Sequence, residues 1–262
     1  MRTAAITSRT NPHVKQLRAA FAGNQRLSDG LVPVEGETLL FEAVRSGIAI
    51  ERVFLADDRA VPTWLPTGLD VLEIDGDTLR SAVDTLSPQG IAALVRPPEW
   101  KLKQVCDPAA SPLVLIAAGL QDPGNMGTLV RSAEAFGAAC VLATPGTVSA
   151  WNSKAVRASA GSVFRMPVVR VTLDEIVALK REGLRVLAAV AEGARAVPDV
   201  DLTGACALLV GNEGAGLSEE WLQLADARIT IPMPGPVESL NAAIAGSLLL
   251  YEAARQRAGR SA

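Results

Sequence analysis

A series of short, nearly continuous apolar runs in the second half of the chain constrains its fold more than any other feature. The first run, PLVLIAAGL at residues 112–120, has the composition of a strand that is buried on both faces of a sheet. Similar runs follow, separated by segments with helical periodicity, at residues 140–144, 168–171, 184–191, 206–212 and 228–233. Alternation of this kind predicts an α/β domain with a parallel sheet over residues 112–262.

The first half of the chain alternates shorter strands and helices, which predicts a small α/β domain over residues 1–96. Its expected strands lie at 31–36, 50–56, 71–74 and 90–95, and its expected helices at 37–46 and 77–83. Residues 1–28 predict a basic helical arm, with Val14, Leu17 and Phe21 at helical spacing. Residues 97–111 contain two adjacent prolines and an Asp-Pro pair, and they are the predicted linker.

Composition excludes several classes of protein. No apolar run approaches the roughly 20 residues that span a bilayer, and the N-terminus lacks the apolar segment of a secretory signal. We therefore expect a cytoplasmic protein that does not associate with membranes. The cysteines at 106, 140 and 206 are far apart, and His13 is the single histidine. We therefore expect no disulfide framework, no metal site and no histidine-based catalysis.

The net charge of −3 conceals two basic segments. Residues 1–28 and 146–173 contain no acidic residue, whereas the rest of the chain is acidic. Such segments can follow a phosphate backbone, although charged residues that only promote solubility would account for them equally well. The candidate RNA contacts within them are Arg9, Lys15, Arg18, Lys154 and Arg157.

Three loops that follow apolar runs carry the polar residues of interest. In the first, GLQDPGNMGTLVRSAEA at 119–135, we expect Asn125 and Gly127 to form the turn because both tolerate positive φ. Met126, Val130 and Ala133 form an apolar stripe, which leaves Arg131 and Glu134 off the core side. The plain alternative for these two is a surface ion pair at i,i+3.

The second loop, GNEGAGLSEEW at 211–221, has three glycines that let the backbone approach a ligand closely. Ser218 is the expected cap of the next helix. Glu213 in the loop and two further acids at the helix start would repel phosphate, so the loop suits a ligand with cationic or hydroxyl groups. An ordinary tight turn is the alternative.

The third loop, IPMPGPVESLN at 231–241, is stiffened by prolines and leads into a long helix that we expect Ser239 to open. The expected core stripe of that helix is Leu240, Ile244, Leu248 and Tyr251. A second face, made of Ala242, Ala245, Gly246 and Leu249, is small and apolar, and we expect it to form a subunit interface.

The three motifs N-x-G-x-x-x-R (125–131), V-G-N-E-G-x-G-L-S (210–218) and I-P-M-x-G-x-V-x-S-L-N (231–241) together resemble those of the SpoU/TrmH family of the SPOUT superfamily. The first half is similar to the L30e-like substrate-binding module of rRNA methyltransferases of the thiostrepton-resistance type. The residues that carry this second resemblance are S-R-x-N-P-x-V-K-x-L-R (8–18), V-E-G (34–36) and S-P-Q-G-I-A-A (87–93).

The resemblance implies an S-adenosylmethionine-dependent 2′-O-ribose methyltransferase of RNA, with 23S rRNA as the favoured substrate. It also implies a deep trefoil knot, an exception to the rule that chains do not thread loops, and a homodimer. The implied cofactor-binding residues are Gly211, Asn212, Ile231, Met233, Ser239 and Leu240.

The resemblance implies a catalytic group of Arg131, Asn125, Glu213, Ser239 and Asn241. A guanidinium with a pKa above about 12 is a donor rather than a base, so we expect Arg131 to hold the target phosphate and stabilise the alkoxide, although general-base catalysis stays open. Asn125 would fix the turn and the ribose or Arg131, and Glu213 would orient polar groups, with Arg131 among the candidates. The alternatives are a non-catalytic RNA-binding relative in ribosome assembly, a tRNA 2′-O-methyltransferase and an unrelated Rossmann-type dehydrogenase, which would need a glycine fingerprint that the chain lacks.

Overall fold

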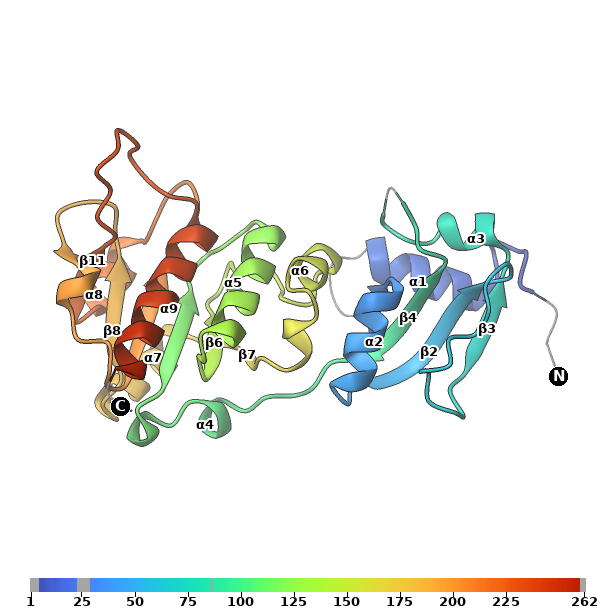
Figure 1. Cartoon of the computed structure of the whole chain (residues 1–262), viewed down its shortest axis with the longest axis horizontal. Coiled ribbons are helices and arrows are strands. Elements are labelled where there is room, and N and C mark those ends of the chain that lie inside the picture. The colour runs from blue at the N-terminus through green and yellow to red at the C-terminus, as the bar shows by residue number, and fades with distance from the viewer. Residues whose placement is uncertain (1–4, 23–28, 86, 260–262) are drawn as a thin grey trace. The chain divides into compact units, whose positions relative to one another are not determined.

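The computed structural model describes residues 5–22, 29–85 and 87–259. The chain forms two compact units (Figure 1). Unit 1 comprises the residues up to Glu99 together with Trp151–Phe164, and unit 2 comprises Trp100–Ala150 and the residues from Arg165 onward. The segment Trp151–Phe164 lies inside the range predicted for the second domain, yet it packs with the first. Sequence patterns did not reveal this because the helix at Ser153–Ala158 packs against the strand at Val32–Glu35, which lies far away in the chain.

Unit 1 is built on a four-stranded sheet with the order β1-β4-β2-β3. The strands are β1 (Val32–Glu35), β2 (Ala49–Ala56), β3 (Val71–Ile74) and β4 (Ile91–Arg96), and β4 is antiparallel to both of its neighbours. The helices are α1 (Pro12–Ala22), α2 (Glu37–Arg45), α3 (Gly76–Arg80) and α6 (Ser153–Ala158). All of the predicted strands are present. The predicted helical arm is wrong for residues 5–11, which are not helical because Ile6 forms a parallel bridge with Ile74. The arm is helical in α1, and residues 1–4 and 23–28 lie outside the described residues.

Unit 2 contains a seven-stranded sheet with the order β7-β6-β5-β10-β8-β11-β9, in which every pairing is parallel. Each predicted run forms a strand, and the short β9 is an addition. The strands are β5 (Leu113–Ala117), β6 (Cys140–Ala143), β7 (Val168–Arg170), β8 (Arg185–Ala189), β9 (Arg195–Ala196), β10 (Cys206–Val210) and β11 (Ala227–Thr230). The predicted parallel α/β sheet is confirmed, whereas the knot stays a prediction.

Helices cover both faces of this sheet. On one face pack α7 (Leu173–Arg181), α8 (Glu219–Leu224) and α4 (Leu102–Val105), the last of which lies within the predicted linker. On the other face α5 (Pro123–Ala135) and α9 (Ala242–Ala258) lie side by side (Figure 1). They approach closely because a Cβ on Gly246 would lie 2.4 Å from Leu129 Cδ2. The hydroxyls of Ser132 and Ser247 also hydrogen-bond at 2.7 Å.

The two faces of α9 are the reverse of the predicted ones. The small face is buried against α5 and the sheet, with Gly246 and Leu249 in the core. Ile244, Leu248 and Tyr251, predicted to be core, are 52%, 42% and 53% exposed. The face with small residues is the buried one because it allows α5 to pack closely against α9. Larger side chains at those positions would keep the two helices apart. The helix also begins later than predicted, at Ala242, and its N-cap is Asn241 rather than Ser239.

No helix among the described residues is long and apolar enough to cross a bilayer.

Candidate cofactor and catalytic site

The three polar loops meet at the edge of the parallel sheet where its strands end. Strand β10 pairs with both β5 and β8, and β8 pairs with β11, so these strands are neighbours. Because parallel strands end at the same edge, the loops that follow β5, β10 and β11 lie together there. Segments more than 90 residues apart in sequence are thereby in contact, as the hydrogen bond from Asn212 Nδ2 to the Gly119 carbonyl (2.9 Å, 93 residues apart) shows.

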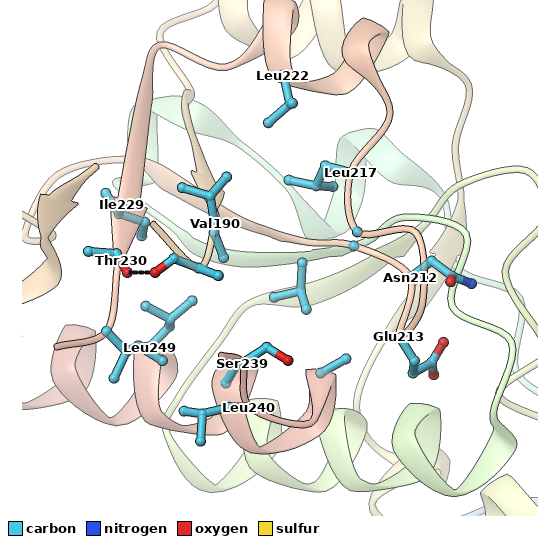
Figure 2. Close-up of a pocket in the computed structure, with 18 of the residues that line it drawn as sticks. Val190, Asn212, Glu213, Leu217, Leu222, Ile229, Thr230, Ser239, Leu240 and Leu249 are labelled. Atoms are coloured by element: carbon cyan, nitrogen blue, oxygen red, sulfur yellow. Dashed lines mark hydrogen bonds between the residues drawn. The ribbon is translucent and has the colours of Figure 1, made fainter. Parts of the chain in front are cut away.

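A pocket of about 320 Å³ lies between these loops and the start of α9. Figure 2 shows Leu217 and Leu222 on one side and Ser239, Leu240 and Leu249 on the opposite side. All of the predicted cofactor-binding residues line it: Gly211, Asn212, Ile231, Met233, Ser239 and Leu240. The sequence did not single out other lining residues, among them Val190, Ala191, Leu217 and Thr230. Their position in the chain could have identified two of them, since Val190 and Ala191 directly follow β8 at the same edge of the sheet.

The loop after β10 has a tightly closed backbone. Asn212 and Gly216 form an antiparallel bridge, with both N–H···O distances at 3.0 Å. The Asn212 side chain accepts hydrogen bonds from the Gly214 and Ala215 N–H groups at 2.9 and 3.1 Å. A Cβ on Gly211 would lie 2.5 Å from Gly216 backbone atoms, so this position admits only glycine. The result is a rigid wall of main chain on one side of the pocket.

A chain of side-chain hydrogen bonds joins all three loops. Asn241 Nδ2 donates to Asn125 Oδ1 at 3.1 Å, and Asn125 Nδ2 donates to Glu213 Oε1 at 2.9 Å. Glu213 also accepts from the backbone N–H groups of Gln121 and Asp122 at 3.4 and 3.3 Å. Asn241 Oδ1 caps α9 by accepting from the first N–H groups of that helix. Three of the five predicted catalytic residues are therefore brought into one network, and the fourth, at position 239, lines the pocket nearby.

Asn125 does not play the predicted role of a positive-φ turn residue. The helix α5 begins at Pro123 with Asp122 as its N-cap, so Asn125 and Gly127 lie inside it. The left-handed residue of this loop is Gly119, at φ 66°. The Asp-Pro-Gly turn signal thus marked a helix start, and Asn125 projects from the first helical turn toward the two other loops.

Arg131 is exposed on α5, and its guanidinium makes no hydrogen bond or ion pair to any residue that the structure describes. The expected alternative, a surface pair with Glu134, is wrong because Glu134 binds Arg165 in a two-pronged contact at 2.5 and 3.1 Å. Glu213 does not orient Arg131 either, since it binds Asn125. Arg131 is not among the pocket-lining residues. It lies six positions after Asn125 on the helix, which corresponds to about 9 Å along the helix axis.

The pKa of Glu213 is lowered from its ordinary value. Partial burial raises it, but the hydrogen bonds from Asn125 and from the Gln121 and Asp122 N–H groups favour the carboxylate and outweigh that effect. Because the folded pKa lies below the unfolded one, the contribution of Glu213 to stability is complete above the unfolded pKa of about 4.3 and is lost as the pH falls through the folded pKa.

This shift predicts a pH dependence that is specific to Glu213. Urea unfolding of the wild type and of Glu213→Gln at a series of pH values should give a difference in the free energy of unfolding that is constant above about pH 5. The difference should shrink below about pH 4, because the wild-type carboxylate is then protonated too. A difference that grows toward acidic pH would contradict the assigned hydrogen bonds.

The candidate RNA contacts all fall in unit 1, because Lys154 and Arg157 lie on α6. Arg9, Lys15 and Lys154 are exposed. The guanidinium of Arg18 instead donates to the Ser81 carbonyl and hydroxyl at 3.3 and 3.2 Å, so this side chain is held within the unit. Two basic segments that are far apart in sequence therefore belong to one compact body.

The pocket fits S-adenosylmethionine better than it fits a dinucleotide. Its lining contains no lysine or arginine, and it includes the carboxylate of Glu213 and many apolar side chains. Such a lining lacks a cationic partner for a pyrophosphate and accommodates a cationic sulfonium, an amino group and ribose hydroxyls. Over the described ranges, no group of three or more His, Cys, Asp or Glu residues could hold a metal ion.

A parallel α/β sheet with this cation-free pocket at its carboxyl edge is the arrangement expected of a methyltransferase that uses S-adenosylmethionine. Residues 112–251 match the model of the SpoU rRNA Methylase family, and residues 11–93 match that of the MRM3-like substrate binding domain. The chain belongs to the SpoU rRNA methylase family. It is an RNA 2′-O-ribose methyltransferase that uses S-adenosylmethionine.

Similar proteins cover nearly the whole chain. The 23S rRNA (guanosine(2553)-2′-O)-methyltransferase RlmP of Bacillus subtilis is 34% identical, over 94% of this chain and 97% of its own length. The crystal structure of the SpoU methyltransferase AviRb from Streptomyces viridochromogenes matches with a TM-score of 0.82 at 31% identity, covering 96% of this chain and all of that one. An AdoMet-bound rRNA methyltransferase from Sinorhizobium meliloti matches with a TM-score of 0.83 at 29% identity, covering 96% and 97%.

Proposed function

We propose that this protein methylates a ribose 2′-oxygen of 23S rRNA in the cytoplasm and that it works as a homodimer. The observation that carries the proposal is the pocket at which the three loops meet, with Asn241, Asn125 and Glu213 hydrogen-bonded in series beside it. The name of the Bacillus subtilis relative supports 23S rRNA as the substrate, because that protein aligns over almost its entire length.

The cofactor is held mainly by backbone and apolar groups. The main chain at Gly211 and Ile231 and the side chains of Met233 and Leu240 line the pocket, and Asn212 fixes the loop that closes it. Bound S-adenosylmethionine supplies an activated methyl group on a sulfonium. The tightly closed loop at Gly211 keeps this wall in place before the cofactor arrives, which reduces the ordering cost of binding.

The catalytic task of the protein is to make a ribose hydroxyl nucleophilic without histidine. Arg131 binds a phosphate of the target strand and stabilises the developing alkoxide, because its exposed guanidinium has no internal partner among the described residues. Asn125 and Asn241 offer an amide pair that positions the ribose, and Glu213 holds Asn125 in place. Ser239, which lines the pocket, completes the polar edge.

RNA binding involves the exposed cations of unit 1. Arg9, Lys15, Lys154 and the half-buried Arg157 bind backbone phosphates away from the target nucleotide, whereas the acidic surface elsewhere on the chain disfavours non-specific RNA contacts. Removal of any one of these contacts is expected to reduce the salt dependence of binding by about one unit of slope.

The test of the proposed function is a map of 2′-O-methylation on rRNA and tRNA from cells with and without this chain. One 23S rRNA position is expected to lose its methyl group when the chain is absent, and purified protein with S-adenosylmethionine should restore it on a transcript. If 23S rRNA methylation is unchanged and a tRNA methyl group is lost, the substrate of the protein is tRNA rather than 23S rRNA. No lost methyl group in any RNA would favour the non-catalytic relative.

The homodimer is supported by the exposed apolar stripe on α9. Ile244, Leu248 and Tyr251 lie one turn apart on one helix face, and Tyr251 packs edge-to-face on Phe136 with ring centroids at 5.8 Å. A contiguous apolar surface of this kind marks an interaction site. The helix α5, which carries Arg131, packs along α9, so a dimer through this stripe completes the site beside Arg131.

Leu248→Asp is therefore expected to produce a monomer. Wild-type protein at micromolar concentration should scatter light as a particle of twice the chain mass of 27.3 kDa, whereas the variant should have the single mass. Gln223→Asp, which adds the same charge to an exposed position of α8, is the matched control and should stay dimeric. A monomeric wild type would contradict the proposed assembly.

A further inference from the structure

A cluster of polar and aromatic side chains in unit 1 has no role in the site described above. It surrounds the start of α2 and consists of Glu35, Glu37, Phe41, Arg59, Trp64 and Gln89. Its central residues, Glu35 and Gln89, belong to two of the sequence motifs of unit 1, V-E-G at 34–36 and S-P-Q-G at 87–90. We call it the α2 cluster.

The central observation is the carboxylate of Glu35, a side chain with only 7% exposure at the end of β1. Its Oε1 accepts hydrogen bonds from Thr85 Oγ1 at 2.7 Å and from the Gln89 N–H at 3.4 Å. Its Oε2 is buried and has no hydrogen-bond partner among the residues that the structure describes. A buried carboxylate oxygen without a donor costs free energy, and such costs are found mainly at functional sites.

Gln89, which contacts this carboxylate through its backbone N–H, has an exposed side chain. Gly36 adopts φ 96°, and Gln89 Oε1 lies 2.8 Å from the place where a Cβ on Gly36 would be. The same oxygen accepts from the Glu37 N–H at 3.2 Å. Because Gln89 is exposed, its amide can rotate and present Nε2 as a donor beside the Glu35 acceptor.

Aromatic rings stand at the outer side of the cluster. The Glu37 carboxylate accepts from Trp64 Nε1 at 3.4 Å and from Arg59 Nη2 at 3.3 Å. Phe41 lies one turn after Glu37 on α2 and packs edge-to-face on Trp64, with centroids at 5.4 Å. Phe41 is 42% exposed, so a ring face remains available to a flat ligand.

The charges of the cluster select the chemistry of that ligand. The cluster contains two carboxylates and one guanidinium, which is paired with Glu37, so the cluster repels phosphate and attracts N–H donors. A flat ring with amino or imino groups on its edge could stack on the exposed face of Phe41 and donate a hydrogen bond to Glu35 Oε2. An unpaired nucleobase has this combination, and proteins recognise single-stranded RNA by stacking and base-edge hydrogen bonds.

We propose that the α2 cluster binds one unpaired nucleobase of the RNA substrate, an inference that rests on the proposed function. The base edge donates a hydrogen bond to Glu35 Oε2 and accepts one from Gln89 Nε2, while the ring stacks on Phe41. Phosphate contacts are made elsewhere, at Arg131 and at the exposed cations of unit 1. The α2 cluster therefore contributes affinity that does not depend on salt.

The experiment measures binding of the full chain to a 23S rRNA transcript at several salt concentrations. Glu35→Gln keeps the volume and the acceptor for Thr85 but places an amide donor where the base must donate. It should weaken binding about tenfold, or about 1.4 kcal/mol, with an unchanged salt slope. Its melting temperature should stay equal or rise, because an amide is cheaper to bury than a carboxylate.

Phe41→Ala should weaken binding similarly, since stacking of one base on an aromatic ring contributes about 1–3 kcal/mol.

Two control variants test whether the lost affinity comes from the α2 cluster itself. Thr67→Ala changes an exposed residue of the same loop as Trp64 and should bind like the wild type. Lys15→Ala should lower the salt slope by about one, which neither cluster variant does. The proposal is overturned if both cluster variants bind within about twofold of the wild type. It is also overturned if Glu35→Gln loses affinity only together with a large fall in melting temperature, because Glu35 is then structural.

Failure of the proposed function has a different signature in the same series. In that case the wild type itself neither methylates the transcript nor binds it more tightly than a transcript of unrelated sequence. If the wild type methylates the transcript and the cluster variants match it, the enzyme function stands and the nucleobase site does not.

Discussion

Replacement of Arg131 by alanine is expected to lower the rate of methyl transfer by about 10²–10³-fold, the usual effect of removing a donor that stabilises developing negative charge. The affinity for S-adenosylmethionine should remain within about twofold of wild type, because Arg131 is absent from the residues that line the pocket. Single-turnover assays with tritiated cofactor measure the first quantity and calorimetry measures the second.

Two further variants make this prediction specific. Arg131→Lys keeps the charge but loses the planar fork that binds a phosphate with two hydrogen bonds, so it should recover only part of the rate. Arg181→Ala removes an exposed arginine of α7, on the opposite face of the sheet, and should transfer methyl groups at the wild-type rate. Full activity of Arg131→Ala would refute the role assigned to this residue.

Gly211→Ala is expected to lower the affinity for S-adenosylmethionine by roughly 100-fold, or about 2.8 kcal/mol. The added Cβ would lie 2.5 Å from the Gly216 carbonyl atoms and 2.7 Å from the Leu217 nitrogen. These are backbone atoms of the loop that forms one wall of the pocket, so the loop must move and the bridge between Asn212 and Gly216 must break. Calorimetric titration with S-adenosylmethionine measures the loss.

The matched control for this variant is Gly235→Ala, in the loop at 231–241. A Cβ at Gly235 meets no atom within 4 Å, and this exposed glycine is absent from the residues that line the pocket. Its cofactor affinity should therefore stay within about threefold of wild type, since an unstrained surface change rarely exceeds about 0.5 kcal/mol. Equal affinity of the Gly211 and Gly235 variants would show that the loop after β10 does not shape the cofactor pocket.

Local patterns were sufficient to predict the strands and the polar loops. The run at 112–120 formed a strand buried at every position of β5 because its length and uninterrupted apolar composition exclude a surface helix. The Asp-Pro-Gly signal at 122–124 located a chain reversal correctly but did not distinguish a turn from a helix N-terminus. That distinction depends on the Asp122 side chain, which accepts from the Asn125 N–H at 2.8 Å.

Partners of charged residues could not be predicted from spacing. Glu134 lies three residues from Arg131, an interval that allows a pair, yet it binds Arg165, 31 residues further along the chain. A surface ion pair at i,i+3 contributes only a few tenths of a kcal/mol. The two hydrogen bonds from Arg165 to Glu134 therefore form in place of a pair between Glu134 and Arg131. Arg131 is therefore left exposed and without an ion-pair partner among the described residues.

The order of residues along the chain alone determined that a buried parallel sheet forms and that three loops at its carboxyl edge carry the polar motifs. These properties follow from apolar run length, period and turn chemistry, which act over a few neighbouring residues. The pocket-lining positions Gly211 and Leu240 came instead from the resemblance of those motifs to the SpoU/TrmH family. The tertiary structure decided which face of α9 is buried, that α6 joins unit 1, and that Glu213 holds Asn125 rather than Arg131. Each of these depends on which surfaces meet across the fold, because packing volume and hydrogen-bond geometry are satisfied between segments that are distant in sequence.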